Sequence, residues 1–257
     1  MSNIRRLYNI DYAVCCSVGK VRKNNEDNFY TAGEIRTNVM SNEDAEFFGN
    51  VSSSDNELFA VFDGMGGEAC GEVASFIAAS YCKDFCKDKE QYEEYLYELC
   101  DILNRKVCEE TENRSLVMMG TTAAMVQFGK NAVYVLNVGD SRIYKVSRKK
   151  MNMISQDHVA YGYRGKAPLT KFLGLDSKDE KLKPYIAMGK YKAGDTYLIC
   201  TDGITDMLSE DEILSILNSE NEARQAARDL VNKALEVGGI DNATAIVLQV
   251  HSGKVRR

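Results

Sequence analysis

A short apolar run, residues 58–62, ends directly in an acidic turn rich in glycine that begins with Asp63 and Gly64. Such a junction predicts a β-strand that carries a carboxylate at its tip. The glycines allow other groups to approach the backbone closely and permit positive φ angles. Taken alone, an ordinary strand end is the simpler interpretation of this turn.

Similar acidic turns recur far along the chain, at Asp140, Asp202 and Asp241. Carboxylates that a fold brings within a few ångströms of one another repel and resist ionisation, and a divalent cation removes that penalty. Short, hard oxygen ligands suit Mg²⁺ or Mn²⁺ rather than zinc or copper. With Asp63, these aspartates therefore indicate one metal centre assembled by the fold.

A cation suited to phosphate lies near the N-terminus. Arg22 is followed closely by Glu26 and Asp27. The planar guanidinium matches two phosphate oxygens at once, which the ammonium of Lys23 cannot do. A charged turn is the simpler interpretation of this segment in isolation, but the acidic turns elsewhere favour a phosphate-binding role for Arg22.

The bulk composition limits the classes of protein to consider. The chain has 257 residues, of which 44% are hydrophobic and 27% charged, and its only two prolines mark no linker. We therefore expect one soluble domain over residues 1–257. The net charge of −6 argues against nucleic acid as a partner. Without a secretory signal or an apolar run of about 18 residues, we expect no membrane association and a cytoplasmic location.

The eight cysteines do not form a disulfide or zinc pattern. There is no Cys-x-x-Cys pair, and His158 and His251 are the only histidines. Zinc-ligand spacing is therefore absent. We expect most of the cysteines to be reduced, buried and small apolar residues in character.

Apolar periodicity outlines the secondary structure. Strands are expected at residues 11–18, 27–32, 57–62, 121–128, 131–138, 142–147, 151–155, 195–201 and 243–250. Helices are expected at about 73–85, 92–107, 209–218 and 221–237. The polar stretch 50–56 is interpreted as a hairpin loop. Runs of strands interrupted by helix pairs, rather than strict alternation, favour an α+β layered sandwich.

Six segments in order resemble the PPM, or type 2C, family of metal-dependent protein serine/threonine phosphatases, and are most similar to its compact bacterial members. The segments are residues 19–27, 61–67, 119–122, 138–142, 201–206 and 241–244. The resemblance spans nearly the whole chain. It implies an α+β fold that is a four-layer α-β-β-α sandwich, with two central, mainly antiparallel sheets flanked by helix pairs.

The resemblance also implies a reaction, the hydrolysis of phosphoserine and phosphothreonine esters by a water or hydroxide that bridges two Mn²⁺ or Mg²⁺ ions. Asp63 would bridge the metals, and the Gly64 carbonyl would contact one of them. Asp202 and Asp241 would ligate the first metal. Arg22 would bind the substrate phosphate and is, with Asp63, an expected catalytic residue.

Further positions match the family's outer metal ligands. Glu26 and Asp27 would act mostly through metal-bound water. Asp140 and Asp206 match a third, weaker metal site, so two or three Mn²⁺ or Mg²⁺ ions are implied per chain.

Two features depart from the family pattern, and the first is Met65. Many relatives carry a histidine at this position, where it is thought to protonate the leaving alkoxide. Methionine cannot donate that proton, so a metal-bound water is the expected general acid. Losing general-acid assistance costs about 10²–10⁴-fold in rate, and aryl phosphates, which need less protonation, would lose less.

The second departure is a flap-like loop over about residues 157–174, which is shorter than the helical flap of relatives. Its glycines and its proline predict an irregular loop. Tyr161, Tyr163, Arg164 and Lys166 either contact a phosphopeptide or form loop surface, and both interpretations stay open. Tyr163 and Arg164 are the candidate substrate-binding residues of this loop.

The leading hypothesis is thus an active protein phosphatase, a signalling enzyme that is expected to be a monomer and to act on targets of a serine/threonine kinase. One alternative is a weak or non-catalytic sensor or scaffold with the same fold. That reading predicts a missing carboxylate, yet Asp63, Asp202 and Asp241 are all present. A small-molecule phosphatase is the other alternative, because the motifs say little about the leaving group.

Overall fold

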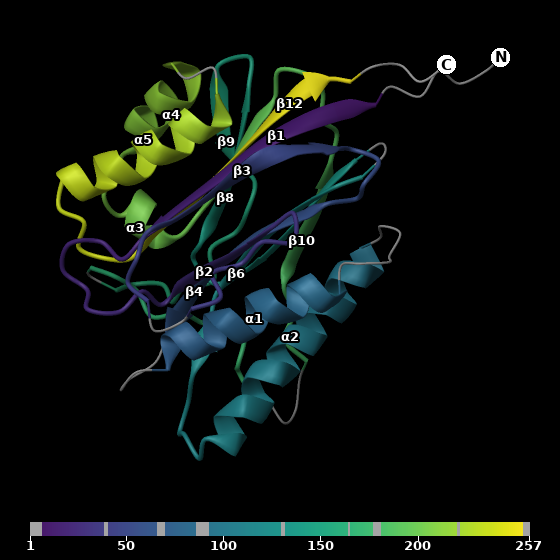
Figure 1. Cartoon of the computed structure of the whole chain (residues 1–257). Coiled ribbons are helices and arrows are strands. Elements are labelled where there is room, and N and C mark those ends of the chain that lie inside the picture. The colour runs from purple at the N-terminus through teal and green to yellow at the C-terminus, as the bar shows by residue number, and fades with distance from the viewer. Residues whose placement is uncertain are drawn as a thin grey trace.

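The computed structural model describes residues 7–38, 41–65, 70–85, 93–129, 132–163, 165–176, 181–219 and 222–253. Two antiparallel sheets form its centre. Their strand orders are β3-β1-β12-β11-β8-β9 and β10-β7-β6-β4-β2, and β5 also pairs with β4. Helix pairs cover the outer faces of both sheets (Figure 1). The predicted four-layer α+β sandwich is confirmed.

The elements have the following bounds. The first sheet contains β1 (Tyr8–Ser17), β3 (Ala45–Ser52), β8 (Arg142–Ser147), β9 (Lys150–Met153), β11 (Thr196–Cys200) and β12 (Ala243–Ser252). The second contains β2 (Asp27–Thr31), β4 (Leu58–Met65), β5 (Gly120–Thr121), β6 (Ala123–Phe128), β7 (Val133–Val138) and β10 (Tyr185–Gly189). The helices are α1 (Gly71–Phe85), α2 (Glu93–Asn113), α3 (Asp202–Thr205), α4 (Glu210–Ser219) and α5 (Ala223–Glu236).

Three apolar layers hold the sandwich together. One lies under α1 and α2, another under α3, α4 and α5, and the third fills the space between the sheets. The sequence of α5 favours an amphipathic helix, because its buried residues recur at helical spacing along one face. They include Ala223, Ala227, Leu230 and Ala234. None of the described helices is long and apolar enough to cross a bilayer.

Phe128 is the centre of an aromatic cluster between the sheets. It is fully buried, and its ring centroid lies 5.2 Å from that of Tyr191, 5.3 Å from that of Tyr197 and 6.4 Å from that of Phe59. We expect Phe128→Ala to lower the free energy of unfolding by about 3–5 kcal/mol, because it leaves a cavity in a closely packed core. Urea denaturation measures this. Phe48→Ala, on a ring that is 54% exposed and stacked on Arg224, should cost about 1 kcal/mol or less; equal costs would contradict the prediction.

Two strands were not predicted, and the interpretation of residues 50–56 as a hairpin loop was wrong in part. Residues 50–52 belong to β3, and the link that follows leads to β4 in the other sheet instead of joining paired strands. Both β3 and the other unpredicted strand, β10, are edge strands with half-exposed residues. Most residues of these two strands are only partly buried, so their apolar alternation is weak.

The predicted strand 121–128 is interrupted at Thr122, which separates β5 from β6. The interruption has a structural role, because β5 pairs with the end of β4 beyond Asp63, while β6 pairs with its beginning. The remaining predicted strands and helices are confirmed with shifts at their ends. Seven cysteines lie in the described part of the chain, and five of them, Cys16, Cys70, Cys82, Cys100 and Cys200, are buried, as expected.

Candidate metal centre and phosphate site

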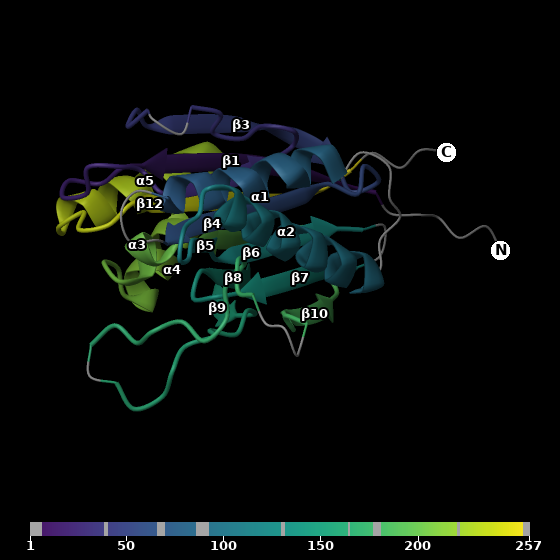
Figure 2. The same ribbon diagram turned by 90° about the horizontal axis from the view of Figure 1, so that it is seen from below.

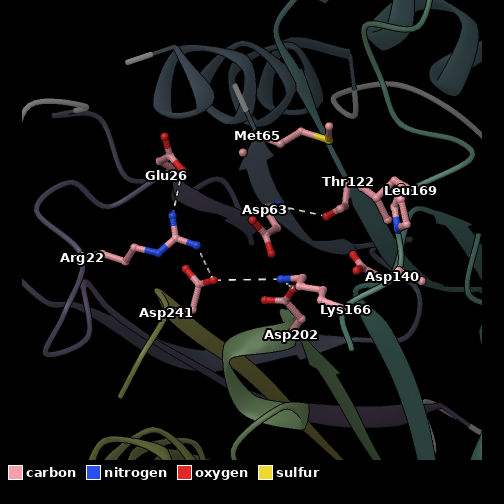
Figure 3. Close-up of a pocket in the computed structure, with 13 residues that line it drawn as sticks. Arg22, Glu26, Asp63, Met65, Thr122, Asp140, Lys166, Leu169, Asp202 and Asp241 are labelled. Atoms are coloured by element: carbon pink, nitrogen blue, oxygen red, sulfur yellow. Dashed lines mark hydrogen bonds and ion pairs between the residues drawn. The ribbon is translucent and has the colours of Figure 1, made fainter. Parts of the chain in front are cut away.

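The candidate site is a cleft of about 460 Å³ at one end of the sheets. It is lined by Arg22, Glu26, Asp63, Gly64, Met65, Thr122, Asp140, Lys166, Ala167, Pro168, Leu169, Asp202 and Asp241. The carboxylates come from separate strand ends and loops, yet Figure 3 shows Asp63, Asp140, Asp202 and Asp241 around a common centre. The fold therefore gathers the acidic turns, as the sequence predicted.

Asp63 is held by its backbone, which leaves its carboxylate to the cleft. Its N–H donates to Thr122 Oγ1 at 3.0 Å. Its carbonyl accepts from the Thr122 N–H at 2.8 Å and from Thr121 Oγ1 at 2.9 Å. Asp27 lies opposite it in the register of β2 and β4. The break between β5 and β6 thus supplies the hydroxyls that fix this strand tip.

Gly64 is required by close packing. Its N–H donates to the Glu26 carbonyl at 3.1 Å. A Cβ at this position would collide with the carbonyl oxygens of Gly71, at the start of α1, and of Glu26. A side chain would therefore push α1 or the Glu26 turn away from the cleft, so the residue that leaves its carbonyl accessible is necessarily glycine.

Asp202 and Asp241 are brought together by another close approach. Asp202 begins α3 directly after β11, and at the next position, Gly203, a Cβ would collide with the Asn242 carbonyl. The side chain of Asp202 is buried, and its Oδ1 has no hydrogen-bond partner in the described part of the structure. A buried carboxylate oxygen without a donor is costly unless a cation meets it.

Asp27 lies behind this pair and is almost fully buried. Its Oδ2 accepts hydrogen bonds from Thr201 Oγ1 at 2.8 Å and Thr244 Oγ1 at 2.7 Å. Within the described residues its Oδ1 has no partner. The two threonines orient the carboxylate, and one oxygen is left over for a cation or a water.

Arg22 lies at the mouth of the cleft with 47% of its side chain exposed. Its Nη2 donates to Asp241 Oδ2 at 2.6 Å, and its Nη1 lies 4.0 Å from Glu26 Oε2 (Figure 3). The guanidinium is thus anchored by carboxylates on one side and open to solvent on the other.

Crowding shifts the carboxyl groups toward their protonated forms. Burial, and then the charges of Asp202, Asp27 and Asp140, raise the pKa of Asp63 well above its ordinary value. Burial and then Asp202 raise the pKa of Asp140 to about 6. Burial is also the largest cause of the raised pKa values of Glu26, Asp27 and Asp206. The site carries more negative charge than its own cations neutralise.

The oxygen donors of the site are of the kind that a hard divalent cation binds, but they do not form a complete set of ligands around one point. Among the described residues, no three His, Cys, Asp or Glu side chains form a ready coordination shell. Lys166 stands among them instead: its Nζ hydrogen-bonds to Asp202 Oδ2 and lies 4.0 Å from both Asp206 Oδ2 and Asp241 Oδ2. Carboxylate oxygens, the unpartnered Asp202 Oδ1 and the raised carboxyl pKa values all suit Mg²⁺ or Mn²⁺.

Lys166 is the site residue whose position the sequence did not settle. Both interpretations left open for it, peptide contact or loop surface, placed it outside the carboxylate cluster. No local pattern around it signals an inward orientation. Its neighbour Tyr163 is exposed and is not among the residues that line the cleft, so its substrate-binding role stays a prediction. Arg164 lies outside the described residues.

The raised carboxyl pKa values predict how pH affects the stability of the metal-free protein. Asp27, Asp63 and Asp140 bind protons more tightly in the folded state than in the unfolded chain. The contributions of Asp27 and Asp140 to stability are therefore fully present below about pH 4 and are lost as the pH rises through about 7 and about 6. The contribution of Asp63 changes with pH in the same direction. His158, whose pKa is lowered by burial and then by Lys171, acts in the opposite direction but is one group against three.

We therefore expect the Tm of the protein in EDTA to fall by roughly 3–6 °C between about pH 5.5 and 7.5. Differential scanning calorimetry measures this change. Saturating Mn²⁺ should abolish or reverse it, because the cation stabilises the ionised carboxylates. A Tm that rises with pH in EDTA would contradict the crowding of these groups.

Comparison with known proteins agrees with this geometry. Residues 34–236 match the family described as Protein phosphatase 2C. The serine/threonine phosphatase stp of Listeria innocua is 28% identical over 253 residues, which cover 90% of this chain and 92% of that protein. The serine/threonine protein phosphatase PstP of Mycobacterium tuberculosis is 30% identical over 260 residues, which cover 93% of this chain and 45% of that longer protein.

A solved structure of the catalytic domain of PstP in complex with two manganese ions is similar in fold. It has a TM-score of 0.76 and 27% sequence identity, and the match covers 95% of this chain and 100% of that one. Two antiparallel sheets with clustered carboxylates and an arginine in the cleft at their ends define a metal-dependent phosphatase. The chain belongs to the protein phosphatase 2C family.

Proposed function

We propose that this protein hydrolyses phosphoserine and phosphothreonine esters on other proteins, with Mn²⁺ or Mg²⁺ as cofactor. The observation that carries the proposal is the convergence of Asp63, Asp202 and Asp241 beside Arg22 in one cleft. The naming of its relatives as serine/threonine phosphatases, and the two manganese ions in the PstP structure, support it.

The metal ions would be held by the residues at the centre of the cleft. Asp63 would hold both ions, the Gly64 carbonyl would contact one of them, and Asp202 and Asp241 would hold the first. Divalent ions in such a site lower the pKa of water and stabilise charge on a phosphoryl group.

The outer carboxylates are assigned separate roles. Glu26 and Asp27 would act mostly through water, which agrees with the two threonine hydroxyls already bound to Asp27. Asp140 and Asp206 would form a third and weaker site. The 56% exposure of the Asp206 side chain supports the weaker assignment, because solvent competes there for the same ligand.

Arg22 would hold the substrate phosphate. Its guanidinium is anchored by Asp241 and lies at the open mouth of the cleft. A cation bound by Asp241 takes over that carboxylate's charge, which leaves the guanidinium free to donate to two phosphate oxygens. Substrate would then be oriented with its ester bond directed toward Asp63.

Met65 lines the cleft where it cannot transfer a proton. Its thioether has no ionisable hydrogen, and no histidine is among the residues that line the cleft. The leaving alkoxide of serine or threonine therefore receives no proton from this side chain. Aryl phosphates, with better leaving groups, should react faster relative to phosphothreonine than in relatives with a histidine there.

One assay tests the function. The protein is given a phosphothreonine peptide and an aryl phosphate, first with Mn²⁺ and then with EDTA, beside Asp202→Asn. We expect the protein to hydrolyse both substrates with Mn²⁺. EDTA and the Asp202→Asn substitution should each abolish this activity. No metal-dependent turnover of either substrate would support a sensor or scaffold instead. Turnover of the aryl phosphate alone would favour a small-molecule phosphatase.

Several finer assignments belong to the same proposal. Residues 1–257 would act as a single phosphatase domain with a flap-like loop at about 157–174. The substrates would be proteins phosphorylated by a serine/threonine kinase, and the enzyme would act as a monomer. We also assign the protein to the cytoplasm, whose reducing conditions suit thiols such as those of Cys16, Cys100 and Cys200.

A further inference from the structure

The flap-like loop is tied down at its base. The His158 N–H donates to the Gly139 carbonyl at 2.9 Å, and the Thr170 N–H donates to the His158 carbonyl at 2.8 Å. Val159 and Leu169 form a β-bridge across the loop. The base is therefore fixed beside Asp140, while the rest of the loop extends as an arm beyond the sheets (Figure 2).

The tip of the loop has little packing of its own. Gly162 and Gly165 adopt positive φ angles of 85° and 88°, and a Cβ on either glycine would meet no atom within 4 Å. Tyr161 and Tyr163 are exposed. Among the described residues of the loop, Lys166 forms the ion pairs with the acidic side chains of the cleft, and the residues that follow it line the same cleft.

Lys166 places its ammonium inside the carboxylate cluster (Figure 3). Its Nζ hydrogen-bonds to Asp202 Oδ2, whose side chain is only 7% exposed, and lies 4.0 Å from oxygens of Asp206 and Asp241. The side chain of Lys166 as a whole remains 56% exposed, so it reaches inward from solvent. The positive charge of Lys166 thus lies among three carboxylates of the site.

Two of these carboxylates, Asp202 and Asp241, are the ones assigned to the first metal. Asp202 and Asp241 cannot bind a divalent ion closely while an ammonium stands between them, because the two cations would repel at short range. The occupants are therefore mutually exclusive. Whichever binds the carboxylates also decides whether the loop is attached to the cleft through Lys166.

The geometry points to a regulatory role for Lys166. Its ammonium binds the carboxylates in place of a metal ion and so attaches the flap-like loop to the metal-free site, and a divalent metal displaces it on binding. This inference rests on the proposed metal site. It links metal binding to release of the flap-like loop. The metal ion favours the released loop, and the loop attached through Lys166 disfavours metal binding. The apparent affinity for metal is then reduced by the fraction of molecules in which Lys166 is bound.

The first test measures metal affinity. Mn²⁺ is titrated calorimetrically into the wild type, Lys166→Met and the control Lys171→Met. Lys171 lies in the same loop, but its Nζ donates to the Lys183 carbonyl, away from the carboxylates. We expect Lys166→Met to bind Mn²⁺ about three- to tenfold more tightly than the wild type, with the control within about twofold. Equal affinities for all three proteins would overturn the inference.

The second test separates displacement from simple charge repulsion. Hydrogen exchange of the peptide over residues 159–169 is followed by mass spectrometry with and without Mn²⁺. In the wild type, Mn²⁺ should accelerate exchange, whereas in Lys166→Met exchange should be fast already and unchanged by metal. Wild-type exchange that Mn²⁺ leaves unchanged or slows, while calorimetry shows binding, would overturn displacement and leave the metal site intact.

Failure of the metal site itself gives a different result. If the wild type and both variants bind no Mn²⁺, the proposed function and this inference fall together. Thermal denaturation of the variants without metal checks that each is folded. Because Lys166 is half exposed, its replacement removes no core packing.

Discussion

Asp63→Asn is expected to lower kcat/KM for a phosphothreonine peptide by about 10³-fold or more with saturating Mn²⁺. Asparagine keeps the shape of the side chain and its backbone contacts with Thr121 and Thr122. It removes the charge that would hold two divalent ions together. Initial rates at several peptide concentrations, normalised to the wild type, measure the effect.

The same substitution should stabilise the metal-free protein. The raised pKa of Asp63 shows that its ionised form is disfavoured by burial and by the neighbouring carboxylates. Removing that charge should raise Tm in EDTA by roughly 3–6 °C near neutral pH, and the further rise that Mn²⁺ gives the wild type should be lost. Opposite changes in activity and metal-free stability distinguish this effect from simple misfolding.

Asp211→Asn is the matched control for Asp63→Asn. Asp211 is exposed in the first turn of α4, outside the cleft. Its replacement removes the same charge from the chain, so activity and the Mn²⁺-induced rise in Tm should both be retained. Activity of Asp63→Asn within about tenfold of this control would contradict the bridging role of Asp63.

Arg22→Ala is expected to lower kcat/KM by about 10²-fold, mostly through a higher KM. Its guanidinium is the cation at the open mouth of the cleft, where the substrate phosphate would enter. Arg22→Lys should recover only part of the loss, because an ammonium cannot donate to two phosphate oxygens in a fixed plane. Steady-state kinetics at saturating Mn²⁺ separate KM from kcat.

Arg114→Ala supplies the control for Arg22→Ala. Arg114 is 46% exposed, against 47% for Arg22, and it pairs with Glu110 near the end of α2. Loss of a comparable ion pair away from the cleft should leave KM unchanged. An Arg22→Ala enzyme with an unaltered KM, or one that Arg22→Lys restores fully, would show that phosphate is held elsewhere.

Much of the fold follows from local patterns, and the exceptions have a common cause. The core strands and four of the helices could be predicted because burial on two faces or along one stripe leaves a strong periodic signal. The edge strands β3 and β10 could not, because solvent on their exposed faces accepts polar residues. The four-residue helix α3 is likewise too short for its periodicity to be recognised.

The site divides in the same way. The carboxylates could be identified as candidate metal ligands from the sequence, because an apolar run followed by aspartate and glycine, as at Asp63 and Gly64, is a local signal. The way in which those turns converge is visible in the folded structure alone. The same is true of Lys166, whose ammonium lies between Asp202 and Asp241. That contact depends on the path of a loop fixed at its base far along the chain, and no spacing of neighbouring residues encodes such a path.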